Sequence, residues 1–180
     1  MMPEQSKELI TDALQARREG RHQDAKRDLT GAVDLCRKGG AQVDVARALT
    51  ALGQIERDLH NLDAALLHYQ EAAAIYRGQA NHSKLAHTIR HVADIHRSAD
   101  RPALAEPCYD EALSLYRKDP QTTPLELANA IRGLALLKSA AGDAPRATAL
   151  WTEARDLYRE ADVNESVAES ERRLALLTGR

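Results

Sequence analysis

The sequence predicts an all-α protein built from repeated pairs of helices. Ala, Leu, Arg, Glu and Gln dominate the 180 residues and Phe is absent, so local propensity favours helix along most of the chain. The chain also resembles itself at a shift of about 40 residues, which is typical of repeat architectures. Within each repeat, apolar residues recur at spacings of three and four, as they do on one face of a helix.

The clearest repeat begins with a branched aliphatic residue followed by alanine. Successive copies start at Val45, Leu85, Leu127 and Val167, which gives offsets of 40, 42 and 40 residues. A period in this range indicates stacked supersecondary units that bury one continuous core. We therefore expect one domain over residues 1–180, with repeats at 5–40, 43–80, 83–120 and 124–162 and a capping helix at 164–178.

The second half of each repeat carries alanines around one large residue. The large residue follows the first alanine by four positions, and a second alanine comes three positions later, so all three lie on one helix face. This pattern predicts a packing face that a neighbouring helix approaches closely. Its members are Ala25, Leu29 and Ala32, then Ala65, Tyr69 and Ala72, then Ala105, Tyr109 and Ala112, and finally Ala147, Trp151 and Ala154.

The first half of each repeat has a helical stripe of its own. In the second repeat this stripe is Leu49, Leu52, Gly53 and Ile55, and equivalent apolar residues follow in the next two repeats. Turn residues separate the two halves, at Glu19-Gly20-Arg21, Leu59-His60-Asn61, Ala99-Asp100-Arg101-Pro102 and Ala141-Gly142-Asp143. Each repeat is therefore expected to be a helix, a turn and a second helix.

These residues resemble the tetratricopeptide repeat. Gly53 matches the small residue of that repeat's first helix, and the alanine, aromatic and alanine series matches its second. The period of 40 to 42 resembles the long-helix variety found in kinesin light chains and in bacterial peptide-sensing regulators. The resemblance implies a right-handed superhelix whose first helices line a concave groove, where protein or peptide partners bind. Glu171, at a normally apolar position, fits a capping role for the last helix.

The residues expected to line this groove lie one or two positions off the packing stripe of the first helices. Arg90, Arg132 and Arg172 recur in register, which suggests that they hold an acidic or carboxylate-ended segment of a partner. The alternative is a solvated arginine face paired with nearby Glu and Asp. The full set is Arg47, Gln54, His87, Arg90, His91, Asp94, Arg97, Asn129, Arg132, Arg172 and Arg173.

Charge and hydropathy restrict the partner and the compartment. The net charge of −2 supplies no general attraction to nucleic acid or an anionic membrane. No apolar run approaches the roughly 20 residues that span a bilayer, and residues 1–20 lack the layout of a secretory signal. We expect a cytoplasmic protein with no membrane partner, and nucleic-acid binding is unlikely.

No catalytic residue, metal site or cofactor is predicted. The chain has no phosphate-binding glycine loop and no pairing of a nucleophile with a base. His87 and His91 lie four apart and Asp94 follows, but the stretch lacks the glutamate of the HExxH pattern and Arg90 would oppose a cation. We interpret these histidines as solvated or ligand-contacting groups whose titration could make binding sensitive to pH.

The sequence thus favours a non-catalytic scaffold that binds a peptide-like segment. A ligand-sensing regulatory module, in which a small peptide or metabolite changes the superhelix, is the main alternative. Nucleic-acid binding is a remote one, and it would weaken steeply with added salt. We also predict a tendency to form a homodimer through a terminus or helix edge, because Leu174, Leu176 and Leu177 cannot all be buried by one neighbouring helix.

Overall fold

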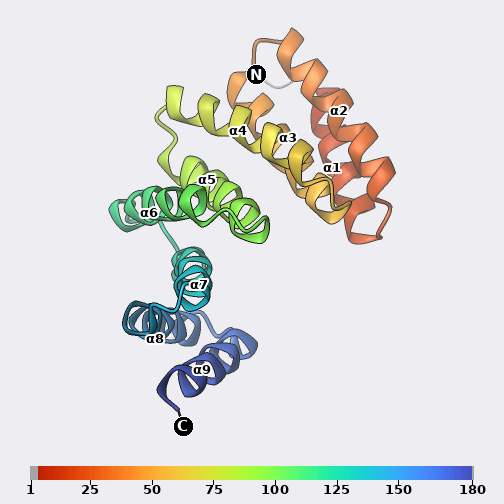
Figure 1. Ribbon diagram of the computed structural model, residues 1–180. Coiled ribbons are helices and arrows are strands. Elements are labelled where there is room, and N and C mark those ends of the chain that lie inside the picture. The colour runs from red at the N-terminus through yellow and green to blue at the C-terminus, as the bar shows by residue number, and fades with distance from the viewer. Residues whose placement is uncertain (1–3, 180) are drawn as a thin grey trace. The chain divides into compact units, whose positions relative to one another are not determined.

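The computed structural model describes residues 4–179 as a succession of α-helices joined by short turns (Figure 1). No strand occurs among these residues, so the predicted all-α architecture of consecutive helix pairs is confirmed. The nine helices of the described chain are α1 (Glu4–Arg18), α2 (His22–Lys38), α3 (Gln42–Asp58), α4 (Leu62–Gly78), α5 (His82–Ser98), α6 (Pro102–Lys118), α7 (Pro124–Ala140), α8 (Ala144–Glu160) and α9 (Asn164–Thr178).

Most helices end in the same hydrogen-bonded turn. The residue before the next helix donates its backbone N–H to the carbonyl five positions earlier, as Asn61 does to Glu56 at 2.8 Å. The residue between adopts a left-handed conformation, which glycine tolerates best. Gly20, Gly40 and Gly142 occupy this position in three turns, and His60, Ala80, Asp100 and Asp162 occupy it in the others. The predicted breaks therefore coincide with the observed turns.

The connection between α6 and α7 is built differently. Asp119 is extended, and Thr123 caps α7 by accepting a hydrogen bond from the backbone N–H of Glu126. The Glu126 carboxylate in turn accepts from the backbone N–H of Thr123 at 3.0 Å, which completes a capping box. This longer connection accounts for the period of 42 at that repeat.

The chain divides into two compact units, and the boundary falls between Thr88 and Ile89, inside α5. In the N-terminal unit, α1 packs on α2, α2 on α3 and α3 on α4. In the C-terminal unit, α6 packs on α7, α7 on α8 and α8 on α9. Each unit is therefore held together by contacts between helices that follow one another in the sequence.

The alanine and aromatic positions form the core of each unit, as predicted. In α4, Ala65, Tyr69 and Ala72 are fully buried, and in α8 Ala147, Trp151 and Ala154 are too. Leu174 and Leu177 of α9 pack against the cluster around Trp151. Burying a large apolar side chain of this kind contributes roughly 1.5–3 kcal/mol to folding.

Gly53 shows why the first helix needs a small residue. A Cβ atom at this position would lie 2.9 Å from the Tyr69 ring of α4, closer than a carbon contact allows. The absent side chain therefore permits α3 and α4 to pack with Tyr69 between them.

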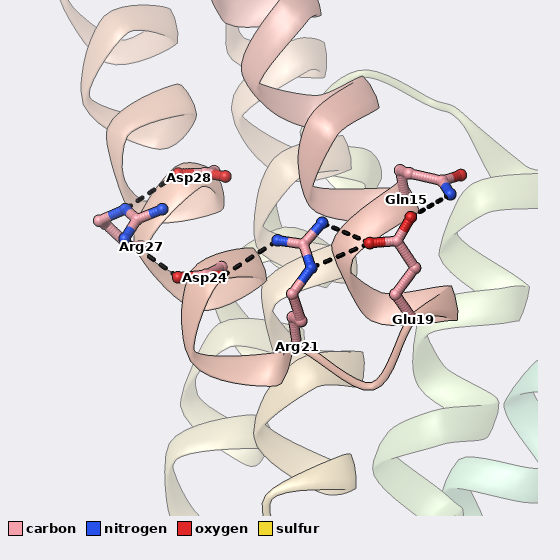
Figure 2. A network of polar contacts seen from close by, with 6 residues as sticks. All are labelled: Gln15, Glu19, Arg21, Asp24, Arg27 and Asp28. Carbon is pink, nitrogen blue, oxygen red and sulfur yellow. Dashed lines mark hydrogen bonds and ion pairs between the residues drawn. The ribbon is translucent and has the colours of Figure 1, made fainter.

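A polar network covers the turn between α1 and α2 (Figure 2). Arg21 lies at its centre and donates hydrogen bonds to Glu19 at 2.5 Å and to Asp24 at 3.0 Å. A hydrogen bond from Gln15 and others from Arg21 keep the pKa of Glu19 below its ordinary value. The network links the end of α1 to the start of α2, and its members are Gln15, Glu19, Arg21, Asp24, Arg27 and Asp28.

Candidate functional site

The residues predicted to line the groove fall in both units. Three of them belong to the N-terminal unit, where Arg47 is exposed and His87 is half-buried. Arg47 lies 3.2 Å from the Asp44 carboxylate, and Gln54 accepts a hydrogen bond from Arg17 at 2.9 Å. The remaining eight belong to the C-terminal unit, which contains all three arginines predicted to hold an acidic segment.

In the C-terminal unit, Arg90 of α5 is held by its neighbours on the same helix. Its guanidinium donates to Asp94 at 2.8 Å, and the two side chains are only 14% and 15% exposed. It also lies 3.0 Å from Nε2 of the buried His91 ring. Because a guanidinium can only donate, Nε2 must be the acceptor in this contact. A neutral His91 therefore carries its proton on Nδ1.

Tyr109 of α6 extends from the core to the polar side of α5. Its hydroxyl donates to Asp94 at 2.7 Å and accepts from Arg97 at 3.2 Å. Gly133 of α7 lies against the same ring, and a Cβ atom there would be 2.4 Å from Cε1 of Tyr109. The glycine leaves space for the tyrosine, which joins the core to the charged residues of α5.

The hydroxyl of Tyr158 reaches a polar residue in the same way. The Tyr158 hydroxyl of α8 donates to Asn129 of α7 at 2.9 Å. Burial raises the pKa of Tyr158 and of Tyr116 to about 12, so both hydroxyls keep their protons near neutral pH. Burial likewise raises the pKa of Tyr109 far above its ordinary value. Tyr109 and Tyr158 thus act as hydrogen-bond donors to Asp94 and Asn129.

Charged side chains of α5, α7 and α9 lie within electrostatic reach of Tyr158. The charges of Arg90, Arg132 and Glu169 all act on its phenol. Arg132 also lies within electrostatic reach of Asp94. We call the surface formed by Arg90, Asp94, Asn129, Arg132, Glu169 and Arg172 the first-helix surface, because all six residues lie on α5, α7 or α9.

Arg132 forms the best-aligned ion pair of this surface. Its Nε and Nη2 atoms donate to the two carboxylate oxygens of Glu169, at 2.7 and 2.9 Å. The Arg132 side chain is 37% exposed and that of Glu169 is 23% exposed. Hydrogen bonds to Glu169 hold the pKa of Arg132 above its ordinary value. The pair connects α7 to α9.

Arg172 and Arg173 of α9 differ from the other two arginines. Both are exposed, and among residues 4–179 neither forms an ion pair. Arg173 lies over the Trp151 ring, 5.9 Å from its centroid. Both line a surface pocket, which we call the α9 pocket, with Arg132, Glu165, Ser166, Glu169 and Leu176.

The first-helix surface therefore combines predicted and unpredicted residues. The sequence placed Arg90, Arg132 and Arg172 in register. The first two are paired with Asp94 and Glu169, as in the alternative interpretation of an arginine face paired with nearby Glu and Asp, although the sequence did not identify Glu169 as a partner. The sequence pattern gave Tyr109 a place in the packing face and gave no role to the hydroxyl of Tyr158, although both hydroxyls reach this surface. Their positions on the packing stripes gave no sign of this second role.

Two further features of the described residues concern metal binding and membrane insertion. Within residues 4–179, no group of three or more His, Cys, Asp and Glu side chains could hold a metal ion. In the same range, no helix has both the length and the apolar content needed to cross a bilayer.

The arrangement of helices is similar to that of known structures. BtubC (BKLC) from P. vanneervenii matches with a TM-score of 0.79 and 20% identity, over 87% of this chain and 64% of that one. Aspartyl phosphate phosphatase F from Bacillus subtilis matches with a TM-score of 0.88 and 12% identity, over 97% of this chain and 45% of that one. At these identities the likeness concerns the fold, and this chain spans less than two thirds of either protein.

Sequence comparison gives the family. No curated protein matches the chain. The family model for the tetratricopeptide repeat matches twice, over residues 13–78 and 44–118, which together cover more than half of the chain. These matches include Gly53 and the first three of the four alanine series that carried the resemblance in the sequence. The protein therefore belongs to the tetratricopeptide repeat family.

Proposed function

We propose that this chain is a non-catalytic binding module that takes up a peptide-like segment of a partner protein on its first-helix surface. Tetratricopeptide repeats generally serve as scaffolds for protein partners, and this chain has the family's helix pairs. The proposal places the partner in the cytoplasm.

The observation that carries the proposal is the charge of the α9 pocket. Three arginines line it together with Glu165 and Glu169, and within residues 4–179 only Arg132 of the three is paired with a carboxylate. Arg172 and Arg173 are exposed and retain their hydrogen-bonding capacity for a ligand. The planar guanidinium group suits a carboxylate, since it can donate two parallel hydrogen bonds.

Leu176 supports a peptide rather than a simple ion as the ligand. It lines the same pocket, and 78% of its surface is exposed. A peptide with an apolar residue beside acidic ones would cover this leucine while its carboxylates reach the arginines. Burying part of a leucine adds affinity at roughly 25 cal/mol per Å².

An affinity capture from the source cells tests the proposal. The bait proteins are the wild type and the double variant Arg172→Glu/Arg173→Glu, and retained proteins are identified by mass spectrometry. Each exposed charge contact contributes about 0.5–1 kcal/mol and its reversal adds repulsion, so we expect affinity for the true partner to fall about tenfold or more. Neither arginine forms an ion pair within the described residues, so the variant should fold normally.

A matched control changes the same amount of charge elsewhere. Lys38 and Lys118 are exposed at the ends of α2 and α6, and neither is in an ion pair with another described residue. The variant Lys38→Glu/Lys118→Glu should retain the partner. If the wild type and both variants capture the same proteins, the first-helix surface is not the binding site and the proposal fails.

A further inference from the structure

The bond between Glu169 and Arg132 resembles the one that an acidic ligand would make. Both carboxylate oxygens face the two guanidinium nitrogens, at 2.7 and 2.9 Å, which is the fork geometry of bidentate recognition. Both residues line the α9 pocket, next to Arg172 and Arg173. A carboxylate of this chain therefore already occupies the best-formed carboxylate site on the surface.

Nothing in the repeat pattern requires a carboxylate at this position. With the offsets of 40 and 42 residues, Glu169 corresponds to Asn129, His87 and Arg47 in the preceding first helices. Asn129 fills the position with a neutral amide, which accepts a hydrogen bond from Tyr158. The acidic group is thus particular to α9 and is not a demand of helix packing.

The ion pair is also accessible enough to exchange. Arg132 is 37% and Glu169 23% exposed, so water and ions reach both groups. Ion pairs of this kind are partly screened and contribute little net stability. A ligand that brings its own carboxylate to Arg132 would therefore replace one modest interaction with an equivalent one.

We propose that Glu169 is an internal competitor for the ligand, and that an acidic peptide binds the α9 pocket by displacing it from Arg132. This inference rests on the proposed function, because it concerns the same surface. When a ligand carboxylate replaces that of Glu169, the interaction with Arg132 contributes no net binding free energy. The ligand must gain its affinity from Arg172 and Arg173, with which Glu169 forms no ion pair among residues 4–179, so it needs at least two neighbouring acidic groups.

The competition sets the affinity of the pocket. Only molecules in which Arg132 is free can bind such a ligand. The observed Kd is therefore the intrinsic Kd divided by the fraction of molecules in which Arg132 is free. If Glu169 holds Arg132 about nine-tenths of the time, removing the carboxylate lowers Kd about tenfold. Glu169 would thus exclude weakly acidic peptides and admit strongly acidic ones.

Fluorescence anisotropy with a labelled hexaglutamate peptide at low salt tests the inference. The decisive variant is Glu169→Gln, which keeps the shape of the side chain and removes its charge. Its control is Glu165→Gln, since Glu165 lines the same pocket but forms no ion pair with a described residue. We expect Glu169→Gln to bind about tenfold more tightly than the wild type, and Glu165→Gln at most about twofold.

Further variants distinguish a failure of the proposed competition by Glu169 from a failure of the proposed function. Adding Arg132→Gln to Glu169→Gln should abolish the gain in affinity for the peptide, because that gain comes from the Arg132 guanidinium that Glu169 no longer occupies. Equal gains in affinity for Glu165→Gln and Glu169→Gln would overturn the inference. Repulsion between the acidic peptide and any carboxylate of the pocket would then explain both gains. If Glu169→Gln binds like the wild type while Arg172→Glu/Arg173→Glu loses the peptide, the competition is wrong and the proposed function stands. If neither wild type nor Glu169→Gln binds, the acidic ligand class is wrong, and the capture experiment then decides the proposed function separately.

Discussion

At the scale of single residues, the fold depends on places where a side chain is missing. Gly133 lies in the middle of α7, where alanine would favour the helix by about 1 kcal/mol. Tyr109 uses the vacant space to reach Asp94 and Arg97 with its hydroxyl. The glycine is therefore required by packing, and it determines whether a core tyrosine can reach the first-helix surface.

We predict that Gly133→Ala destabilises the protein by about 1–3 kcal/mol, the usual cost of overpacking. The new Cβ atom would lie 2.4 Å from Tyr109, so the ring must move and its hydrogen bond to Asp94 is lost. Urea unfolding measures the difference. Gly31→Ala in α2 is the control, since its Cβ would meet only Leu9 at 3.4 Å and the helix should gain stability. Equal stabilisation by both substitutions would contradict the prediction.

The roles that the sequence did not reveal belong to two kinds of residue. Tyr109 and Tyr158 stand at apolar packing positions, so the helical pattern accounted for them without their hydroxyls. Glu169 is 37 residues away from Arg132, and the stagger of α9 against α7 decides that they meet. Spacing within one helix predicts which residues share a face, but it contains no information about this stagger.

At the scale of helices, the sequence was more informative. The period of 40 to 42 predicted the helix pairs, and the turn residues predicted where each helix ends. The ion pairs between helices did not follow from the repeat, because equivalent positions in the two units carry opposite charges. Lys26 of α2 lies 2.8 Å from Glu56 of α3, whereas Glu106 of α6 lies 2.5 Å from Lys138 of α7. The two units thus use the same contact with reversed polarity.

We predict that Glu56→Lys destabilises the N-terminal unit by about 2–4 kcal/mol, because it buries a cation opposite Lys26. Adding Lys26→Glu should restore at least half of the loss, since it recreates the polarity found at Glu106 and Lys138. A double-mutant cycle from urea unfolding provides the coupling energy. Additive losses in the double variant would show that the pair contributes nothing specific.

The same pair predicts how stability depends on pH. Burial by itself raises the pKa of Glu56, but hydrogen bonds from Lys26 and Asn61 outweigh it and the pKa lies below the ordinary 4.5. A lowered carboxyl pKa stabilises the fold above pH 4.5, and this contribution disappears as pH falls through the lower value of the folded state. Glu56→Gln should therefore weaken the dependence of unfolding free energy on pH in this acidic range. An unchanged dependence would place the titrating groups elsewhere.

At the scale of the whole molecule, α9 connects the proposed binding function with self-association. Leu174 and Leu177 pack against the core around Trp151, and Leu176 is left 78% exposed. A stable dimer buries roughly 800 Å² on each partner, far more than one leucine supplies. If α9 mediates association, the resulting dimer should therefore be weak. It would also cover the pocket in which the peptide is proposed to bind.

We predict that the protein is monomeric at low micromolar concentration and associates reversibly through α9 as concentration rises. Leu176→Glu should remove the association, because it places a charge where the second copy would pack. Leu67→Glu is the matched control, since Leu67 of α4 is 66% exposed and lies in the N-terminal unit. Sedimentation velocity over a range of concentrations separates these outcomes. A wild type that stays monomeric throughout would contradict the predicted dimer, and loss of association in Leu67→Glu alone would assign the interface to α4. If α9 is the interface, hexaglutamate should dissociate the dimer, because peptide and second copy would compete for Arg172, Arg173 and Leu176.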